Sequence, residues 1–276
     1  MSTAATGTTV TATTAATVTA SFGGRSGTVR YHRWRPSGAP VAAVLLLHGL
    51  GEHGGRYADL AEAATAAGIE VWAPDQAGHG RSDGERGLVA DVADLVADAE
   101  TMLRALRGAR PRLPVVVAGH ALGAAVATLL VGEVRDGSDA GGPPDDPAAD
   151  VVGLVLADSS LTSAAGVQAL PDAGGDPLGW TGPLRPETVR ALGGAAARTS
   201  RLVSVGALDH LPVLLLHAQD DAVAPVATAQ AVAAVLPRGR VCTVPHGGHD
   251  VLDQAEACAE LVRFVTAVAA VSAARS

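Results

Sequence analysis

The stretch VVVAGHALGAAV, residues 115–126, decides the fold. It begins with three β-branched residues, which are typical of a short buried strand, and it ends in small residues that favour a helix. Between them, Gly119 and Gly123 predict a tight turn in which the strand and helix backbones approach too closely for side chains. This is the pattern of a nucleophile elbow, G-x-S-x-G, which exposes a serine hydroxyl on a sharp turn. The central residue here is Ala121, so the elbow is predicted but its nucleophile is missing.

Apolar runs on both sides of this stretch alternate with helical patterns. The predicted buried strands are residues 41–47, 69–73, 151–157, 213–216 and 241–244, and the predicted helices are residues 58–67, 89–106, 227–236 and 253–270. Residues 27–36 alternate apolar and polar side chains and predict an edge strand. Strands that alternate with helices predict an α/β fold with a mostly parallel sheet and helices on both faces. Ligands of such sheets bind at the loops that follow the strands.

Composition shifts divide the chain into a core and two additions. Residues 1–20 are rich in threonine and alanine, and we expect a disordered tail there in preference to a frayed edge strand. The core is predicted to comprise residues 21–158 and 209–276. Between these halves, residues 159–208 break into segments punctuated by glycine and proline, which predict a short cap insertion over the sheet.

Charge and cysteine content exclude several classes of partner. The net charge is −8 and all 20 basic residues are arginine, which argues against nucleic acid or an anionic membrane as a partner. Cys242 and Cys258 are predicted to be free thiols in a reducing compartment. The N-terminal residues lack the pattern of a signal peptide, and no apolar run approaches the ~20 residues of a membrane helix. We therefore expect a cytoplasmic protein without an integral membrane segment; the sequence sets no oligomeric state.

No cofactor or metal is predicted. The sequence contains no G-x-G-x-x-G or Walker-type phosphate loop, and no cluster of histidine, cysteine and aspartate with metal-ligand spacing. Any chemistry must therefore come from side chains and backbone amides acting on a small molecule. We expect an ester or another carbonyl compound as that substrate, for the following reasons.

The loop His48-Gly-Leu-Gly51 follows the first buried strand and has the pattern of an oxyanion loop. In such a site, the backbone N–H of Leu50 would join that of Leu122 in binding the negative charge that develops on a carbonyl oxygen. The alternative is an ordinary glycine-rich turn between a strand and a helix.

Two further loops offer a carboxylate and an imidazole. Asp220 and Asp221 follow strand 213–216, and we favour Asp221 as the acid that orients a histidine; the alternative is a solvated turn or a helix N-cap. The loop at residues 245–250, PHGGHD, offers a general base, for which we prefer His249 to His246. The chain order of elbow, acid and histidine is that of the α/β-hydrolases.

Six stretches together carry a resemblance to a known family: HGLGEHGGRY (48–57), APDQAGHGRSDGERG (73–87), GHALG (119–123), DPLGWTGPLRP (176–186), LLLHAQDDAVAP (214–225) and PHGGHDVLDQ (245–254). Over nearly its whole length after the tail, the chain resembles the monoacylglycerol lipase branch of the serine α/β-hydrolases. The resemblance implies an α/β-hydrolase fold and hydrolysis of carboxylic esters.

The same resemblance implies a role for individual residues. It places the nucleophile position at Ala121, the acid at Asp221, the base at His249 and the oxyanion donors at the amides of Leu50 and Leu122. His48, His79 and His120 are expected to shape their loops, and Glu52 and Arg56 to form a local ion pair that holds the oxyanion loop. The segment at residues 159–176 is short for the family's lid, and Trp180 is the only aromatic residue of the insertion. We therefore expect an open mouth that suits a compact ester, or a bulky one that a full lid would exclude.

Three explanations of Ala121 remain open. We favour an esterase whose serine was replaced deliberately by alanine, which leaves the chain inactive towards esters. The second is a natural relative that isomerises, epimerises or eliminates a carbonyl substrate, with His249 as the base and the oxyanion hole stabilising an enolate. The third is a non-catalytic protein that binds a ligand in the same pocket.

Overall fold

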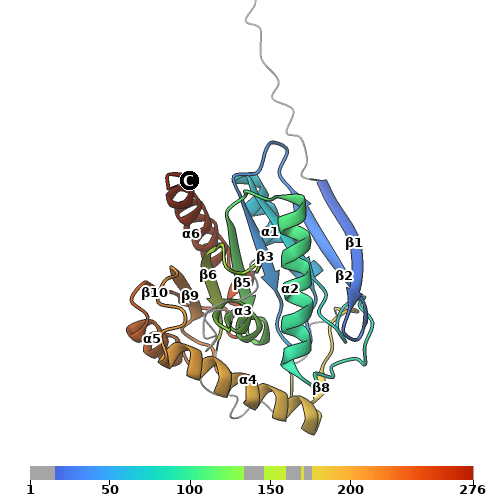
Figure 1. The fold of residues 1–276 in the computed structure, drawn as a ribbon. Helices are drawn as coiled ribbons and strands as arrows, with labels where there is room; N and C mark the ends of the chain where they lie inside the picture. Colours follow the sequence, from blue (N-terminus) through green and yellow to red (C-terminus); the bar gives the residue numbers. More distant parts are fainter. Residues whose placement is uncertain (1–15, 134–145, 160–168, 171–175, 276) are drawn as a thin grey trace, which may run out of the picture.

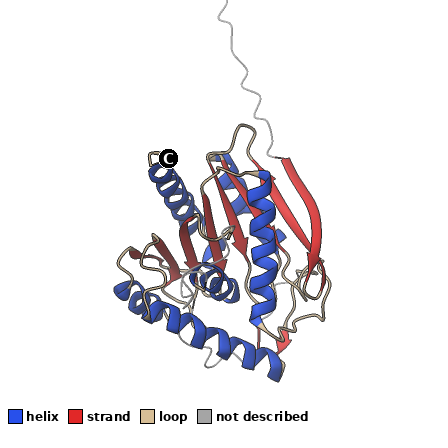
Figure 2. Ribbon diagram, in the orientation of Figure 1, coloured by secondary structure: helices blue, strands red, loops and turns tan. Residues whose placement is uncertain are grey.

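The computed structural model describes residues 16–133, 146–159, 169–170 and 176–275. An 8-stranded sheet in the order β1-β2-β4-β3-β5-β6-β9-β10 forms its centre, and helices cover both faces (Figures 1 and 2). The six strands from β4 to β10 in this order are parallel neighbours, whereas β1 and β2 join one edge in antiparallel pairing. The predicted α/β architecture is therefore confirmed.

The strands of this sheet follow the apolar runs of the sequence. Their bounds are β1 Ala16–Gly24, β2 Gly27–Arg35, β3 Ala42–Leu47, β4 Ile69–Pro74, β5 Val115–His120, β6 Val151–Ala157, β9 Val213–Ala218 and β10 Gly239–Val244. A separate short pair joins β7 Ala169–Leu170 to β8 Gly182–Pro183. Every residue of β3, β4, β5 and β9 is buried, as expected of parallel strands that are covered on both faces.

The helices separate into two layers. Buried side chains of α2 Val92–Ala109, α3 Leu122–Gly132, α4 Pro186–Ser204 and α5 Val226–Val235 share one apolar core, and those of α1 Ala58–Ala66 and α6 Ala255–Ala273 share the other. Two short 3-10 turns, η1 Gly54–Tyr57 and η2 Val251–Asp253, lie in the loops that follow β3 and β10. Among the described residues, no helix is long and apolar enough to cross a bilayer.

The N-terminal edge of the sheet differs from the prediction. Residues 16–20, which we placed in the disordered tail, begin β1, and β1 pairs with β2 from Ala16↔Arg35 to Gly24↔Gly27. Consequently β2 is an interior strand and not the predicted edge strand, because its other side pairs with β4. A segment rich in valine and threonine forms strands readily once a partner is close in the chain, and here only two residues separate the strands. Residues 1–15 of the predicted tail lie outside the described residues.

Helix α4 was missed in the sequence, where glycine and proline suggested only irregular segments. The pair Gly193-Gly194 interrupts the helical pattern, but Ala195, Thr199 and Leu202 on one face are buried, and α4 packs along α3. Burial of that face outweighs the low helix propensity of two glycines, each of which disfavours a helix by about 1 kcal/mol relative to alanine.

Gly193→Ala is therefore expected to raise the free energy of unfolding by about 0.5–1 kcal/mol. A Cβ at this exposed position meets nothing within 4 Å, so the gain in helix propensity has no steric cost. Urea denaturation followed by circular dichroism measures the change. A lower midpoint would contradict the helix described here.

Candidate functional site

The strand-to-helix turn at Ala121 has the geometry that the sequence predicts. Ala121 lies between β5 and α3 with φ 47° and ψ −111°, a backbone conformation that costs an alanine free energy. A Cβ added to Gly119 would lie 2.1 Å from the carbonyl oxygen of Gly123, and one added to Gly123 would lie 2.0 Å from that of Leu47. Both glycines are therefore required by close contact between backbones.

Ala121→Gly is expected to stabilise the protein by about 1 kcal/mol. The positive φ of residue 121 is strained for alanine, whereas glycine adopts it without strain. Ala125→Gly, on the next turn of α3, serves as the matched control and should destabilise by about 1 kcal/mol, since glycine disfavours a helix interior. Chemical denaturation of both variants measures the two effects. Two losses of equal size would show that Ala121 is unstrained.

The loop after β3 lies directly against the elbow. A Cβ on Gly49 would come within 2.9 Å of Nδ1 of His120, the residue that precedes Ala121. Leu122 is the first residue of α3, so its N–H has no carbonyl partner within the helix. Within the described part of the chain, the N–H of Leu50 likewise has no hydrogen-bond acceptor. The two amides that we predicted as oxyanion donors thus belong to neighbouring loops and are both available.

Asp221 and His249 are in direct contact. Nδ1–H of His249 donates to Oδ2 of Asp221 over 2.9 Å, and the buried carboxylate also accepts the N–H groups of Val223 and Ala224 at 2.8 and 2.9 Å. Burial alone would raise the pKa of Asp221, but hydrogen bonds from His217, His249 and Ala224 hold it well below its usual value. Asp221 is therefore a carboxylate that fixes the ring of His249.

The alternative residues of these two loops form a separate pair. Oδ1 of Asp220 accepts the N–H of Gly248 at 2.9 Å, and its Oδ2 lies 3.4 Å from Nδ1 of His246, whose side chain is 86% exposed. The structure thus brings Asp221 and His249 together, whereas Asp220 and His246 make contacts at the surface.

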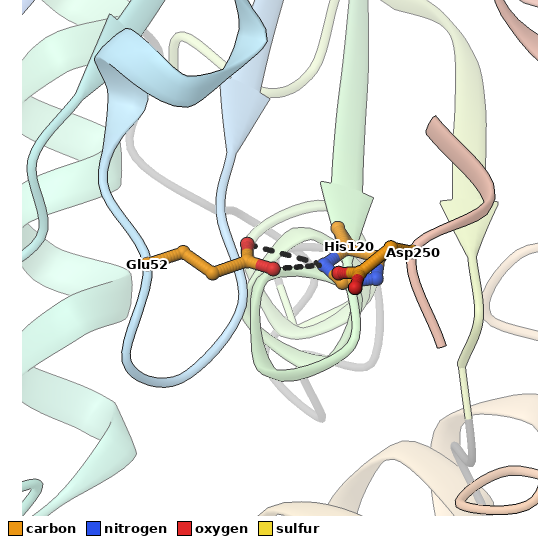
Figure 3. Close-up of side chains that lie close together, drawn as sticks. All are labelled: Glu52, His120 and Asp250. Carbon is orange, nitrogen blue, oxygen red and sulfur yellow. Dashed lines mark hydrogen bonds and ion pairs between the residues drawn. The ribbon is translucent and has the colours of Figure 1, made fainter. Parts of the chain in front are cut away.

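A buried group of charges beneath the elbow was not recognised in the sequence. Glu52 lies beside His120, with its two carboxylate oxygens 3.1 and 3.2 Å from Nδ1 (Figure 3). Oε2 of Glu52 also accepts the hydroxyl of Tyr57 at 2.6 Å and the N–H of Gly49 at 2.7 Å. On its other side, Nε2 of His120 lies 2.8 Å from the carbonyl oxygen of His249.

The predicted ion pair between Glu52 and Arg56 is wrong. Arg56 instead contacts Asp250 at 3.1 Å and Asp253 at 2.7 Å, which tie η1 to the loop that carries His249. The reason is geometric: η1 turns Arg56 towards that loop while Glu52 points at His120. The sequence did offer one signal for the contact between Glu52 and His120: a titratable histidine occupies position 120, the variable position of the elbow.

Among the residues that the structure describes, two groups of side chains have enough ligand atoms for a metal: Glu52, His120 and Asp250, and Asp158, His217 and Asp221. In the first, both ring nitrogens of His120 face oxygen acceptors, and Arg56 already neutralises Asp250. In the second, Nε2 of His217 donates to the carbonyl oxygen of Ala224. Protons and guanidinium groups therefore already compensate these carboxylates.

Comparison with known proteins agrees with the fold. Residues 38–141 match the family described as serine aminopeptidase, S33, and residues 194–266 match that of TAP-like proteins. A solved lipase in its open form superposes with a TM-score of 0.75 at 21% identity and covers 92% of this chain and 99% of its own. The chain therefore has the α/β-hydrolase fold.

Curated relatives of this chain include monoglyceride lipases. Human monoglyceride lipase is 41% identical over 108 residues, which are 39% of this chain and 35% of the relative. Monoacylglycerol lipase of Mycolicibacterium smegmatis is 39% identical over 107 residues, or 38% of each chain. The matched region thus spans about a third of the length of these relatives, and within it this chain is similar to monoglyceride lipases.

The end of the predicted cap insertion contacts the loop after β3, which was predicted to be the oxyanion loop. The N–H of Trp180 donates to the carbonyl oxygen of Gly51 over 2.7 Å, and Nε2 of His53 lies 2.9 Å from Oδ2 of Asp176. Residues 160–168 and 171–175, which include most of the segment that we predicted as a reduced lid, lie outside the described residues. The described part of the insertion therefore supports the loop that carries Leu50.

Proposed function

We propose that this chain is a carboxylic ester hydrolase of the monoglyceride lipase type whose nucleophilic serine is replaced by Ala121. In this proposal Asp221 orients His249, His249 is the general base, and the amides of Leu50 and Leu122 bind the oxyanion. The replacement is proposed to be engineered and to leave the chain inactive towards esters.

The backbone of Ala121 carries this proposal. A residue with φ 47° and ψ −111° is strained unless the surrounding structure enforces it, and alanine gains nothing from the conformation. A nucleophile does gain, because the turn lifts its side chain between the general base and the oxyanion amides. An elbow that retains this strain beside an aligned Asp221–His249 pair supports a site that was built for a serine.

The chemistry follows from the hydrogen bonds. Because Nδ1 of His249 donates to Asp221, Nε2 is the nitrogen that can accept a proton from a hydroxyl at position 121. The hydroxyl oxygen would then attack the ester carbonyl, and the negative oxygen would bind the amides of Leu50 and Leu122. Alanine supplies no oxygen, so no acyl-enzyme forms in the chain as given.

The substrate is proposed to be a small ester, with a short-chain monoglyceride as the first choice. The names of the relatives and the few aromatic residues of the insertion support this class. A cytoplasmic location is also proposed. It is supported by the free thiols of Cys242 and Cys258; burial raises the pKa of Cys258 to about 11, which makes that thiol unreactive.

A second candidate is a carbonyl reaction that needs a base but no nucleophile, such as an isomerisation. The intact Asp221–His249 pair in a chain without the serine favours it. It requires that the chain as given turns over an enolisable carbonyl compound and that His249→Ala abolishes this turnover. Retained turnover in the His249→Ala variant would exclude it.

Ester hydrolysis by the Ala121→Ser variant, beside the chain as given, tests the proposal. The two substrates are p-nitrophenyl butyrate and a short-chain monoglyceride. Turnover by the serine variant alone supports the esterase. Absence of turnover in both chains, with the serine variant folded, contradicts it.

A further inference from the structure

A single buried histidine connects three of the loops that form the candidate site. His120 extends from the end of β5 and is 2% exposed. Its Nδ1 faces the carboxylate of Glu52 in the oxyanion loop, at 3.1 and 3.2 Å. Its Nε2 faces the carbonyl oxygen of His249 at 2.8 Å and Oδ2 of Asp158, at the end of β6, at 3.5 Å.

All of these partners are hydrogen-bond acceptors, and this fixes the protonation of the ring. A neutral imidazole has one bare nitrogen, which would face a carboxylate or carbonyl oxygen without a proton between them. Both nitrogens therefore carry protons. Burial alone would lower the pKa of His120, but the charge of Glu52 and hydrogen bonds to Asp158 and Glu52 raise it well above 6.5.

The partners of His120 in turn fix backbone groups that the proposed chemistry uses. Glu52 accepts the N–H of Gly49, the residue before Leu50, and so sets the direction of the oxyanion loop. Asp158 accepts the N–H of Val251 at 2.6 Å, two residues after His249. Through these contacts, one imidazolium holds the loop of the oxyanion hole and the loop of the base at a fixed separation.

We propose that His120, protonated on both ring nitrogens, is a positioning residue that holds the oxyanion loop and His249 in register with the elbow. It touches no reacting atom and acts through the backbone of its neighbours. The proposal about catalysis rests on the proposed esterase function, whereas the charge state of His120 does not.

The charge state is tested by NMR titration of the ring nitrogens of His120 in the chain as given, assigned with a His120→Gln variant. We expect both nitrogens to stay protonated well above the pH at which an ordinary histidine loses its proton. Glu52→Gln removes the nearest negative charge without changing shape and should bring the loss of the proton back towards 6.5. A ring with one bare nitrogen at pH 7 in the unsubstituted chain would overturn the proposal.

The positioning role is tested in the Ala121→Ser background. His120→Gln retains one donor nitrogen but neither the charge nor the second donor nitrogen, and misplacement by about 1 Å costs on the order of 10²-fold in rate. We expect kcat to fall about 10²-fold while KM changes little. The exposed His246→Gln is the matched control and should leave both values unchanged.

The pH profile separates positioning from a general loss of fold. The charged and titratable groups around His120 are Glu52 and Asp158, His249 and Asp250 of the base loop, and Tyr57 and Arg56 of η1. The Ala121→Ser variant should lose activity at alkaline pH, when His120 releases a proton, and the added His120→Gln should remove this alkaline limb. Unchanged kcat and an unchanged limb would overturn the positioning role. If the serine variant hydrolyses no ester, the proposed esterase function is wrong. The NMR titration alone then decides whether His120 is charged.

Discussion

The Ala121→Ser variant should hydrolyse p-nitrophenyl butyrate about 10⁴- to 10⁶-fold faster than the chain with alanine, in line with the loss on removing a triad serine from subtilisin. The gain comes from one oxygen atom, which opens the acyl-enzyme route. Asp221 and His249 are already joined by a 2.9 Å hydrogen bond, and the turn at position 121 already has its strained conformation. Steady-state kinetics and the burst of p-nitrophenol measure the effect.

The neighbouring aspartates supply a matched control for this result. In the serine background, Asp221→Asn should lower kcat about 10⁴-fold, because the amide no longer fixes the tautomer of His249. Asp220→Asn changes the adjacent side chain, which contacts only Gly248 and His246 near the surface, and should retain most of the activity. Equal losses in the two variants would mean that the 2.9 Å contact has no role in the reaction.

Gly123→Ala should destabilise the protein by about 3 kcal/mol, the upper part of the usual range for overpacking. The added Cβ would lie 2.0 Å from the carbonyl oxygen of Leu47 and 2.6 Å from that of His48. These atoms belong to backbone, so no side chain can rotate to relieve the clash, and α3 must move away from β3. Urea denaturation gives the free energy of unfolding.

Gly108→Ala in α2 is the control for that measurement. Its Cβ would meet nothing within 4 Å, and it is expected to stabilise slightly through helix propensity. Opposite signs in the two variants would identify close packing as the reason for Gly123. A harmless Gly123→Ala would contradict the contact between α3 and β3.

Much of the fold could be predicted because buried parallel strands leave continuous apolar runs. Residues 41–47, 115–117 and 151–157 carry that signal plainly, and the structure forms β3, β5 and β6 there. Helix α4 and strand β1 were missed, because α4 depends on packing against α3 and β1 on its pairing with β2. In the sequence, the glycine pair of α4 and the threonine-rich composition of β1 argue against regular structure. The contacts that stabilise both elements become apparent only in the folded chain.

The part of the candidate site that could be predicted is the part that depends only on which loops follow the strands. Such loops converge in any parallel sheet, so the proximity of Asp221 to His249 follows from topology. The contacts of His120 do not, because Glu52 lies 68 residues before it and His249 lies 129 residues after it. Which side chains a buried histidine contacts depends on the exact path of three loops. The sequence of each loop taken alone does not reveal that path.

The order of the strands also sets when the candidate site can form during synthesis. The oxyanion loop and the elbow precede the cap insertion, whereas Asp221 follows β9, and His249 follows β10, which pairs with β9 alone among the strands of the described sheet. A nascent chain that has emerged only as far as α4 therefore holds Leu50 and Leu122, the proposed oxyanion donors, without Asp221 or His249. The negative charge of Glu52 and the positive charge of His120 can pair at that stage, before the loop that carries His249 has been made.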